Sequence, residues 1–422
     1  MATTDSKEPV TDPPKPTRGT ITFIFLTVCI DAVGFGIVIP VLPDLIAEVS
    51  NTGISGAALW GGYLSFSYAI MQFVFGPAIG NLSDRYGRRP VLLISLFMLA
   101  ADFLIMALAP SLLVLFIGRI LAGIAAATHS TANAFVADIS SREDRARNFG
   151  IIGAAFGIGF VIGPVIGGLA GEYGTRAPFY TAAALAFANF CFGALVLPES
   201  LAPDNRRKFE WRRANPAGGF AQLRKVPTAM WFMLCLFIFE IANFSYPAVW
   251  AYYTREAFKW SSAEVGLSLA AFGLGIALVQ GWLIRYILAW LGEARTLIFG
   301  LLIGIAGAIG FGLATEGWMV YALLLLSALG GVATPALSAL MANCTPDDAQ
   351  GELQGLRTSV LAIVMIISPL VMTQLFGFFT REGTPVYLPG APFLAAALLT
   401  GLALIPFFAG LRRTGATSTR GK

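Results

Sequence analysis

The chain has 422 residues, of which 56% are hydrophobic and only 12% are charged, and its mean hydropathy is +0.73. This composition excludes a soluble globular domain and is typical of a protein with many membrane spans. The net charge of +4 gives no indication of a nucleic-acid partner, because no basic patch has a soluble surface to occupy.

The predicted elements begin after residues 1–19, whose polar, proline-rich composition indicates a disordered tail and not a cleavable signal. Twelve apolar runs follow, each long enough to cross ~30 Å of hydrocarbon as a helix rising ~1.5 Å per residue. They cover residues 20–43, 57–81, 90–109, 111–137, 148–171, 176–197, 227–252, 263–285, 296–314, 317–341, 354–379 and 390–411. The sequence therefore predicts an all-α integral membrane protein with twelve transmembrane helices.

The long connection at residues 198–226 divides these runs into two bundles of six, at 20–197 and 227–411, and residues 412–422 form a C-terminal tail. Of the 28 Lys and Arg residues, 23 fall on the side of the membrane that carries the N-terminal tail and this linker. The positive-inside rule places both termini and the linker in the cytoplasm, and we expect an inner-membrane location. The four cysteines lie in or at the ends of apolar runs, so neither a disulfide framework nor a metal site is predicted.

The two halves show an internal repeat with a constant offset of 205 residues. Four residues of the first half have identical counterparts in the second half: Gly76 and Gly281, Gly87 and Gly292, Gly150 and Gly355, and Pro164 and Pro369. Two six-helix bundles related by a pseudo-two-fold repeat are typical of a transporter whose halves rock about a central site.

The loop GNLSDRYGRRP, residues 80–90, resembles the signature between helices 2 and 3 of the major facilitator superfamily. A glycine at 87 permits a tight turn, and a carboxylate at 84 can accept hydrogen bonds from the arginines. In that family the cluster latches the cytoplasmic side of the bundles, and the block ADISSREDRARNFG after span 4 belongs to the same region. The resemblance therefore implies a conformational latch of Gly80, Asp84, Arg85, Gly87, Arg88, Arg89, Asp138 and Arg145.

Span 5 contains GIGFVIGPVIGGLAG, which resembles the motif of drug/proton antiporters with twelve helices. The i, i+4, i+8 spacing of its glycines gives one helix face a flat groove that another backbone can approach, and its proline introduces a bend. The residues concerned are Gly159, Gly163, Pro164, Gly167 and Gly168.

Span 4 contains GRILAGIAAATHSTANAFVADIS, in which Arg119 matches an intramembrane arginine of the same superfamily. With DAVGFGIVIPVLPDL, LPES and QGELQG, the chain is similar over nearly its whole length to the tetracycline-efflux proteins, which exchange a metal–tetracycline complex for protons. The resemblance implies a monomeric antiporter that works by alternating access, with protons and a small molecule as partners and the proton gradient in place of a cofactor.

Asp31, Asp102, Arg119 and Glu240 all fall near the membrane midplane when each predicted helix is measured from its end. Charged groups at that depth are costly and usually face a cavity or one another. If Asp102 pairs with Arg119, then Asp31 and Glu240 lack a fixed positive partner and become candidate proton carriers or cation sites. The alternative is that each carboxyl group is a satisfied polar contact between helices.

The single histidine, His129, lies one turn from Asn133 on span 4. A histidine there suits substrate binding or proton transfer, and a packed polar contact is the alternative. Two positions depart from the tetracycline-efflux pattern, because Ile276 and Gly304 stand where those proteins carry a histidine and an aspartate.

Three functions remain open from the sequence. The first is proton-coupled export of small amphipathic compounds, with tetracycline-like substrates included. The second is transport of another cargo or in another direction, such as uptake or export of a metabolite or siderophore, since a fold does not decide function. The third is a membrane receptor or membrane-embedded enzyme, against which stand the absence of a nucleotide-binding loop and of a catalytic cluster.

Overall fold

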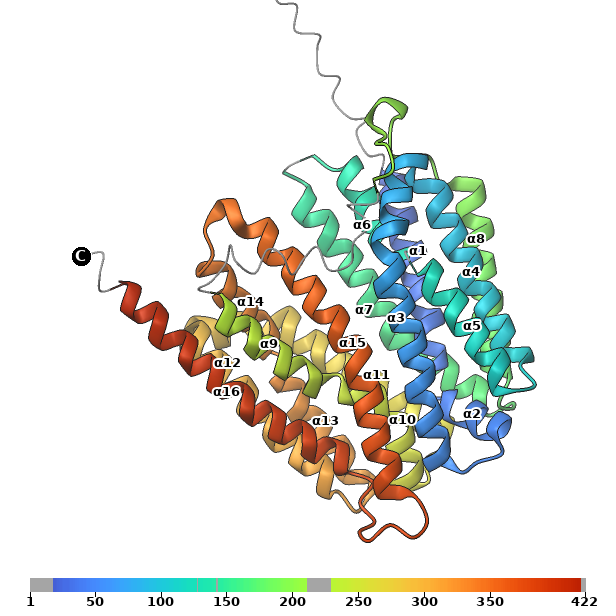
Figure 1. The fold of residues 1–422 in the computed structure, drawn as a ribbon, viewed down its shortest axis with the longest axis vertical. Helices are drawn as coiled ribbons and strands as arrows, with labels where there is room; N and C mark the ends of the chain where they lie inside the picture. The colour runs from blue at the N-terminus through green and yellow to red at the C-terminus, as the bar shows by residue number, and fades with distance from the viewer. Residues whose placement is uncertain (1–17, 127, 142, 211–228, 419–422) are drawn as a thin grey trace, which may run out of the picture.

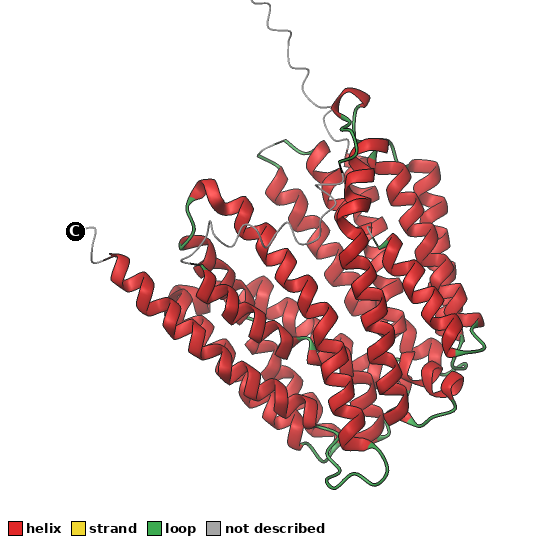
Figure 2. Cartoon of the chain, in the orientation of Figure 1, coloured by secondary structure: helices red, strands yellow, loops and turns green. Residues whose placement is uncertain are grey.

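The computed structural model describes residues 18–126, 128–141, 143–210 and 229–418. Within these ranges the chain consists of helices joined by turns and loops, with no strand (Figure 2). The first half contains α1 (Arg18–Val38), α2 (Leu42–Ser50), α3 (Ile54–Tyr86), α4 (Arg88–Leu108), α5 (Leu112–Ala125), α6 (Thr128–Ile139), α7 (Arg145–Gly171) and α8 (Ala177–Val196). The second half contains α9 (Met230–Asn243), α10 (Ser245–Phe258), α11 (Ser262–Leu278), α12 (Ile284–Leu313), α13 (Gly317–Gly330), α14 (Ala333–Asn343), α15 (Gln350–Thr380) and α16 (Ala391–Ser418).

Short helical turns complete the chain: η1 (Pro203–Asn205) in the linker, the π-helix η3 (Val279–Leu283) and η4 (Asp347–Ala349). Ten segments of the described residues are long and apolar enough to cross a membrane. One of them, Ser262–Leu313, holds two spans, because Gly292 inside α12 has non-helical dihedrals of φ 69° and ψ 171°. The 33-residue helix α3 is the remaining span, so the predicted all-α architecture of twelve transmembrane helices is confirmed.

Several predicted spans are not single helices. The run at 20–43 ends as α1 at Val38, because Pro40 and Pro43 interrupt the helical hydrogen bonds, and α2 then continues to Ser50. The runs at 111–137, 227–252 and 317–341 are each divided into two helices. At the ends of the chain, α1 starts two residues earlier than predicted and α16 continues past 411 to Ser418, while residues 1–17, 211–228 and 419–422 lie outside the described residues.

These helix breaks follow the repeat seen in the sequence. Helix α5 ends at Ala125 and α13 ends at Gly330, which are 205 positions apart, and α1 and α9 end at residues with the same separation, Val38 and Asn243. The turns after the second and eighth spans also match, because Gly87 has φ 105° and its counterpart Gly292 has φ 69°. A side chain with a Cβ is disfavoured at both angles, so the identical glycines serve the same turn. The two halves are therefore structural repeats.

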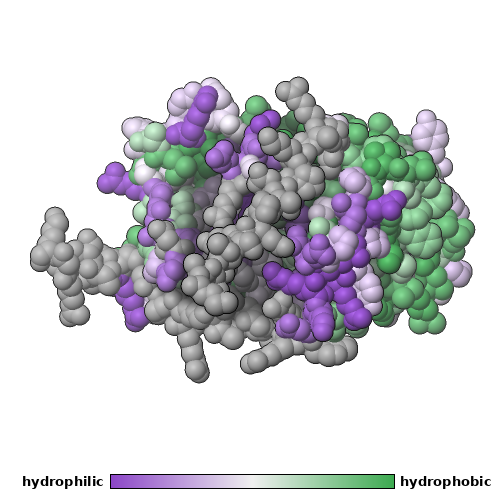
Figure 3. All heavy atoms as spheres, turned by 90° about the horizontal axis from the view of Figure 1, so that it is seen from above, coloured by the Kyte–Doolittle hydropathy of each residue, from purple (hydrophilic) through white to green (hydrophobic). Residues whose placement is uncertain are grey.

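The two bundles lie side by side, converge at one end and diverge at the other (Figure 1). We call the divergent end, which carries the Gly87 turn and residues 198–210, the linker face, and the opposite end, with α2 and the loop 381–390, the far face. Polar and charged residues gather on the linker face, while apolar residues occupy much of its rim (Figure 3). Near the far face the bundles touch directly, where Ser55 Oγ donates to the carbonyl of Gly377 at 3.1 Å.

Helices α3 and α15 make this contact along one seam, and α7 and α11 make it along a second seam. Both seams depend on glycine. A Cβ added at Gly168 of α7 would lie 2.5 Å from the carbonyl oxygen of Ser262, and a Cβ added at Gly377 would lie 2.5 Å from a side-chain carbon of Leu59. The α7–α11 seam therefore packs backbone against backbone, whereas at the α3–α15 seam the Leu59 side chain packs onto Gly377.

The orientation predicted from the Lys and Arg distribution can be tested with single cysteines in a variant that lacks the four native ones. Asp204→Cys lies on the linker face and Glu382→Cys on the far face, and both positions are exposed. We expect a membrane-impermeant maleimide to label Glu382→Cys in intact cells and Asp204→Cys only after permeabilisation, because the Lys-rich and Arg-rich face stays in the cytoplasm. The reverse pattern would contradict the predicted topology.

Candidate functional site

The larger cavity of the bundle has a volume of about 640 Å³, within the range of sites for drug-sized ligands. Its walls come from α1, α3, α4, the α5–α6 junction and α15, so both bundles contribute to it. Aromatic and aliphatic side chains dominate, with a carboxylate, hydroxyls and an amide among them. The principal residues are Asp31, Phe35, Tyr68, Gln72, Phe73, Ser95, Leu99, Thr128, Ser130, Thr358, Ser359 and Met365.

A second cavity of about 210 Å³ adjoins the first and shares Phe35, Tyr68, Ala69 and Met365 with it. It extends towards the far face, where residues of α2 and α10 such as Leu42 and Tyr252 line it. The two cavities thus form successive chambers between the bundles.

Asp31 places its carboxyl group in the larger cavity from the middle of α1. Its Oδ1 atom is buried and has no hydrogen-bond partner, and no ion pair involving Asp31 is found among the described residues. A buried polar oxygen is costly when it is left unpaired. The site is therefore ready for a proton or a cationic group of a ligand.

Asp102 and Arg119 form an ion pair between α4 and α5, as expected from the sequence. Only 1% of the Asp102 side chain is exposed. Arg119 lines the smaller cavity and also lies over the ring of Tyr68, with its guanidinium carbon 5.3 Å from the ring centroid. Arg119 is thereby held by a fixed partner at the wall of the smaller cavity.

Glu240 lies in α9, is 5% exposed and lines neither cavity in this conformation. Asn243 Nδ2 and Thr334 Oγ1 each donate a hydrogen bond of 3.4 Å to its carboxylate. Arg357 of α15 also attracts it electrostatically, although no direct ion pair joins them. In this conformation Glu240 therefore lies outside both cavities, and no ion pair within the described residues neutralises it.

The polar pair predicted on span 4 lies on α6. Asn133 is partly buried and lines neither cavity. His129 belongs to the same helix, but its side chain lies outside the described residues, so its role stays a prediction.

The predicted latch residues surround Arg88 at the linker face. The Arg88 guanidinium pairs with Asp84 at 2.5 Å and with Asp138 at 2.9 Å, which joins the start of α4 to the ends of α3 and α6. Arg145 Nη2 donates to the carbonyl of Ala137 at 3.2 Å. These contacts lie within the N-terminal bundle in this conformation.

The linker contributes to the same cluster through Glu199, whose carboxylate accepts the backbone N–H groups of Arg88 at 2.8 Å and Arg89 at 3.3 Å. It also fills the space beside Gly87, where a Cβ would meet it. Of the other latch residues, Arg85 lies over the ring of Tyr86, and Gly80 of α3 faces open space.

The glycine groove of α7 receives α1. A Cβ added at Gly159 would lie 2.5 Å from the carbonyl oxygen of Cys29, and one added at Gly163 would lie 2.6 Å from that of Val33. Gly167 is also in close contact with the backbone of α1. Pro164 and its counterpart Pro369 both lie inside long helices. The groove therefore joins helices of one bundle, whereas Gly168 faces the other bundle.

Tyr68 and Gln72 are site residues that were not predicted from the sequence. Both lie on α3 and line the larger cavity, and Tyr68 interacts electrostatically with Asp31 and with Arg119. Ser65, Tyr68, Gln72 and Gly76 recur at helical spacing along one face of α3, a pattern that would have revealed this cavity wall. Ile276 and Gly304 line neither cavity.

Comparison with known proteins agrees with this architecture. The family model described as Major Facilitator Superfamily matches residues 24–369 and 232–422. The chain is 40% identical over 350 residues to the class C tetracycline resistance protein of Escherichia coli, covering 83% of this chain and 88% of that protein. It is 38% identical over 404 residues to the class G tetracycline resistance protein of Vibrio anguillarum, covering 92% of this chain and all of that protein.

Among solved structures, a bacterial homologue of the human lysosomal transporter Spinster, described as inward-facing and unoccupied, superposes with a TM-score of 0.72. It is 16% identical and covers 93% of this chain and 96% of its own, which supports the shared fold alone. The chain therefore belongs to the Major Facilitator Superfamily and is a multi-pass membrane transporter related to tetracycline-efflux proteins, not an enzyme.

Proposed function

We propose that this protein exports small amphipathic compounds, with tetracycline-like molecules among them, across the cell's inner membrane in exchange for protons. The observation that carries this proposal is the carboxyl group of Asp31. It faces a drug-sized, mostly apolar cavity without an ion-pair partner, beside an arginine that Asp102 already holds.

The coupling follows from competition at this carboxyl group. A carboxylate in an apolar cavity is stabilised either by a proton or by a cationic ligand group, and one excludes the other. Substrate that enters from the linker face displaces the proton, and a proton that enters after the cavity opens to the far face displaces the substrate. Aromatic rings at Phe35, Tyr68 and Phe73 suit a flat, hydrophobic compound.

Glu240 is the second candidate proton carrier. Its hydrogen bonds of 3.4 Å are long, and Arg357 lies on α15, the helix that also lines the larger cavity through Thr358 and Ser359. A movement of α15 between conformations would therefore change the charge near Glu240 and its contact with the cavity. We propose that this carboxyl group exchanges its proton when the linker face closes.

The latch cluster around Arg88 and the groove of α7 serve the same cycle. We propose that Asp84, Arg88 and Asp138 hold the linker face together when the bundles meet there, and that the bend at Pro164 lets α7 follow α1. With the linker face in the cytoplasm, the present conformation is the one that receives substrate from inside the cell.

A second candidate function is transport of a different cargo. Ile276 and Gly304 favour it, because they supply no ionisable group where tetracycline-efflux proteins carry a histidine and an aspartate. Counterflow in proteoliposomes with tetracycline, other drugs and small metabolites distinguishes the cargoes. Drug-dependent proton release supports export by antiport, whereas accumulation of a metabolite with the proton gradient supports uptake.

The role of Asp31 can be tested with Asp31→Asn in everted membrane vesicles. The amide cannot exchange a proton, so we expect accumulation of tetracycline driven by a pH gradient to fall at least about tenfold. Exchange of labelled for unlabelled substrate without a gradient should continue at saturating substrate, because it needs no proton step, although the amide attracts a cationic group less and the affinity should fall.

Asp204→Asn is the matched control, since this carboxylate lies on the exposed linker far from the cavity. It should transport like the unmodified protein. Gradient-driven accumulation by Asp31→Asn at the unmodified rate would show that Asp31 does not carry the coupled proton.

The pair of Asp102 and Arg119 predicts a different response. Asp102→Asn or Arg119→Gln alone leaves one uncompensated buried charge, a change that costs about 3–5 kcal/mol in buried pairs. We expect each single variant to lose expression and thermal stability in detergent, and the double variant to recover most of the stability. Single variants as stable as the unmodified protein would contradict a structural role for this pair.

A further inference from the structure

An ion pair joins the two bundles at the far face. Asp44 of α2 and Arg255 of α10 approach to 2.5 Å, although they come from opposite halves of the chain. Arg255 Nη2 also donates to Ser262 Oγ at 2.5 Å and to the carbonyl of Pro40 at 3.4 Å. A single guanidinium thus holds the end of α1, the start of α2 and the start of α11.

Glu172 adds a second carboxylate to this junction. It follows the C-terminal end of α7 and accepts the backbone N–H of Ala263 at 3.3 Å, at the start of α11 in the other bundle. The N-terminus of a helix carries partial positive charge, so the contact is favourable. Glu172 also attracts Arg255 electrostatically.

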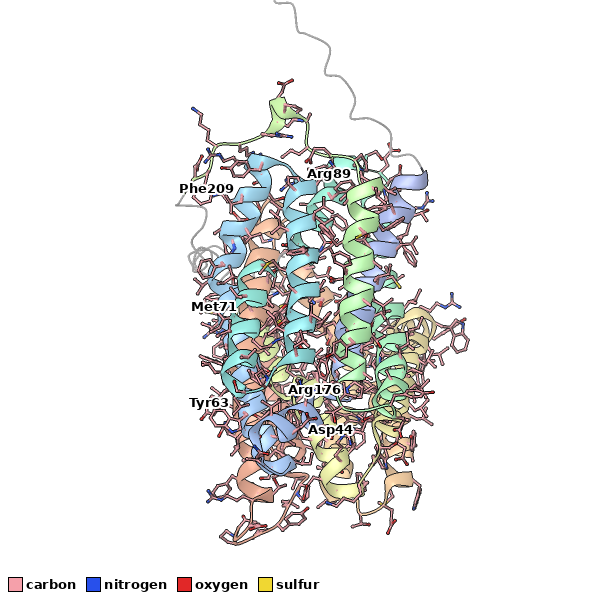
Figure 4. All side chains as sticks on the ribbon, turned by 90° about the vertical axis from the view of Figure 1, so that its right-hand side faces the viewer. Asp44, Tyr63, Met71, Arg89, Arg176 and Phe209 are labelled. Carbon is pink, nitrogen blue, oxygen red and sulfur yellow. The ribbon has the colours of Figure 1, made fainter. Side chains whose placement is uncertain are left out.

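This junction closes the smaller cavity towards the far face. Leu42 and Pro43, which precede Asp44, line that cavity together with Tyr252, one turn before Arg255. The side chains of Asp44 and Arg255 are 27% and 14% exposed, so the pair is largely withdrawn from water. Figure 4 shows Asp44 near the lower end of the N-terminal bundle, beside Arg176 and remote from Arg89 on the linker face.

We propose that Asp44, Arg255 and Glu172 form a charge lock that decides when the cavity opens to the far face. These three are positioning residues of the transport cycle, which act through the packing of α2 and α7 against α10 and α11. The proposal does not depend on the identity of the cargo or on proton coupling. It requires only that the bundles separate at this face.

The physical reason is the cost of an unmatched charge. While the far face is closed, each charge is partly buried and is neutralised by its partner, and when it opens each becomes hydrated. Removal of one partner leaves a buried, uncompensated charge in the closed state only, which favours opening. Replacement of both partners by apolar residues of similar size leaves no buried charge unpaired, so the closed state is restored.

The test measures access to the smaller cavity from the far face. Ala248→Cys, which lines this cavity, serves as the reporter in a variant without the native cysteines. A membrane-impermeant maleimide is applied to the far face of the purified protein in proteoliposomes. We expect Asp44→Leu to raise the labelling rate at least about tenfold, Arg255→Met to raise it less, and the double variant to return it close to the starting rate.

The smaller effect of Arg255→Met on the labelling rate should depend on pH. Burial raises the pKa of Asp44 while Arg255 opposes that rise. The charged and titratable groups around Asp44 are Arg255 and Tyr252 of α10, with Glu172 beyond them and the pair of Glu48 and Arg176 at the other end of α2. Without Arg255 the remaining carboxylate takes up a proton in the closed state, so acidification should slow labelling of Arg255→Met.

Asp44→Leu should show no such recovery, because Arg255 stays charged at every pH in the experiment. Glu48→Leu is the matched control, since Glu48 pairs with Arg176 at 3.1 Å within the N-terminal bundle and joins nothing across the interface. Its labelling rate should equal that of the reporter alone. A monodisperse elution profile and an unchanged thermal unfolding temperature in detergent verify that each variant is folded.

Two results would overturn the proposal. One is a labelling rate in both single variants that equals the rate of the reporter alone. The other is a double variant that labels as fast as Asp44→Leu, which would show that the pair contributes packing and not charge matching.

Discussion

The pairing of Asp102 with Arg119 is the interaction on which the chemistry of the interior depends. A bilayer offers no water to an isolated charge, so the arginine of α5 has to be matched by a carboxylate or exposed to a cavity. Asp102 supplies the match, 1% exposed and opposite Gly118, where a larger residue would collide with it. Because the arginine is occupied, Asp31 of α1 keeps a carboxyl group that has no ion-pair partner within the described residues.

The repeat shows that the ion pair of the latch cluster is confined to one half. The Arg88–Asp138 ion pair has a counterpart 205 positions later, where Asn343 donates to both oxygens of Glu293 at 2.8 and 2.9 Å. The second half keeps the backbone turn and the side-chain contact, but an amide replaces one member of the ion pair. It has no loop with three arginines like that at residues 80–90. The N-terminal bundle therefore carries the ion pairs of Arg88 and of Arg119, and the C-terminal bundle supplies α15, which forms one wall of the larger cavity.

The twelve spans, the two bundles and the Asp102–Arg119 pair were predictable, because hydrophobic length, repeat spacing and charge matching are local or pairwise properties of the sequence. Other side-chain contacts depend on how the helices pack against one another in three dimensions. Glu240 points into hydrogen bonds with Asn243 and Thr334, which its predicted depth alone could not reveal. The pair of Asp44 and Arg255 was not predicted for the same reason, since two residues 211 positions apart meet only when the far face closes.

Ligand-induced proton release from the purified protein shows directly whether substrate and proton compete for Asp31, since it needs neither a membrane gradient nor a known direction of transport. Substrate added to the protein in weakly buffered detergent solution near neutral pH should release protons in proportion to the substrate bound, and Asp31→Asn should bind substrate without releasing them. Equal proton release by the unmodified protein and Asp31→Asn, at matched substrate occupancy, would contradict the account.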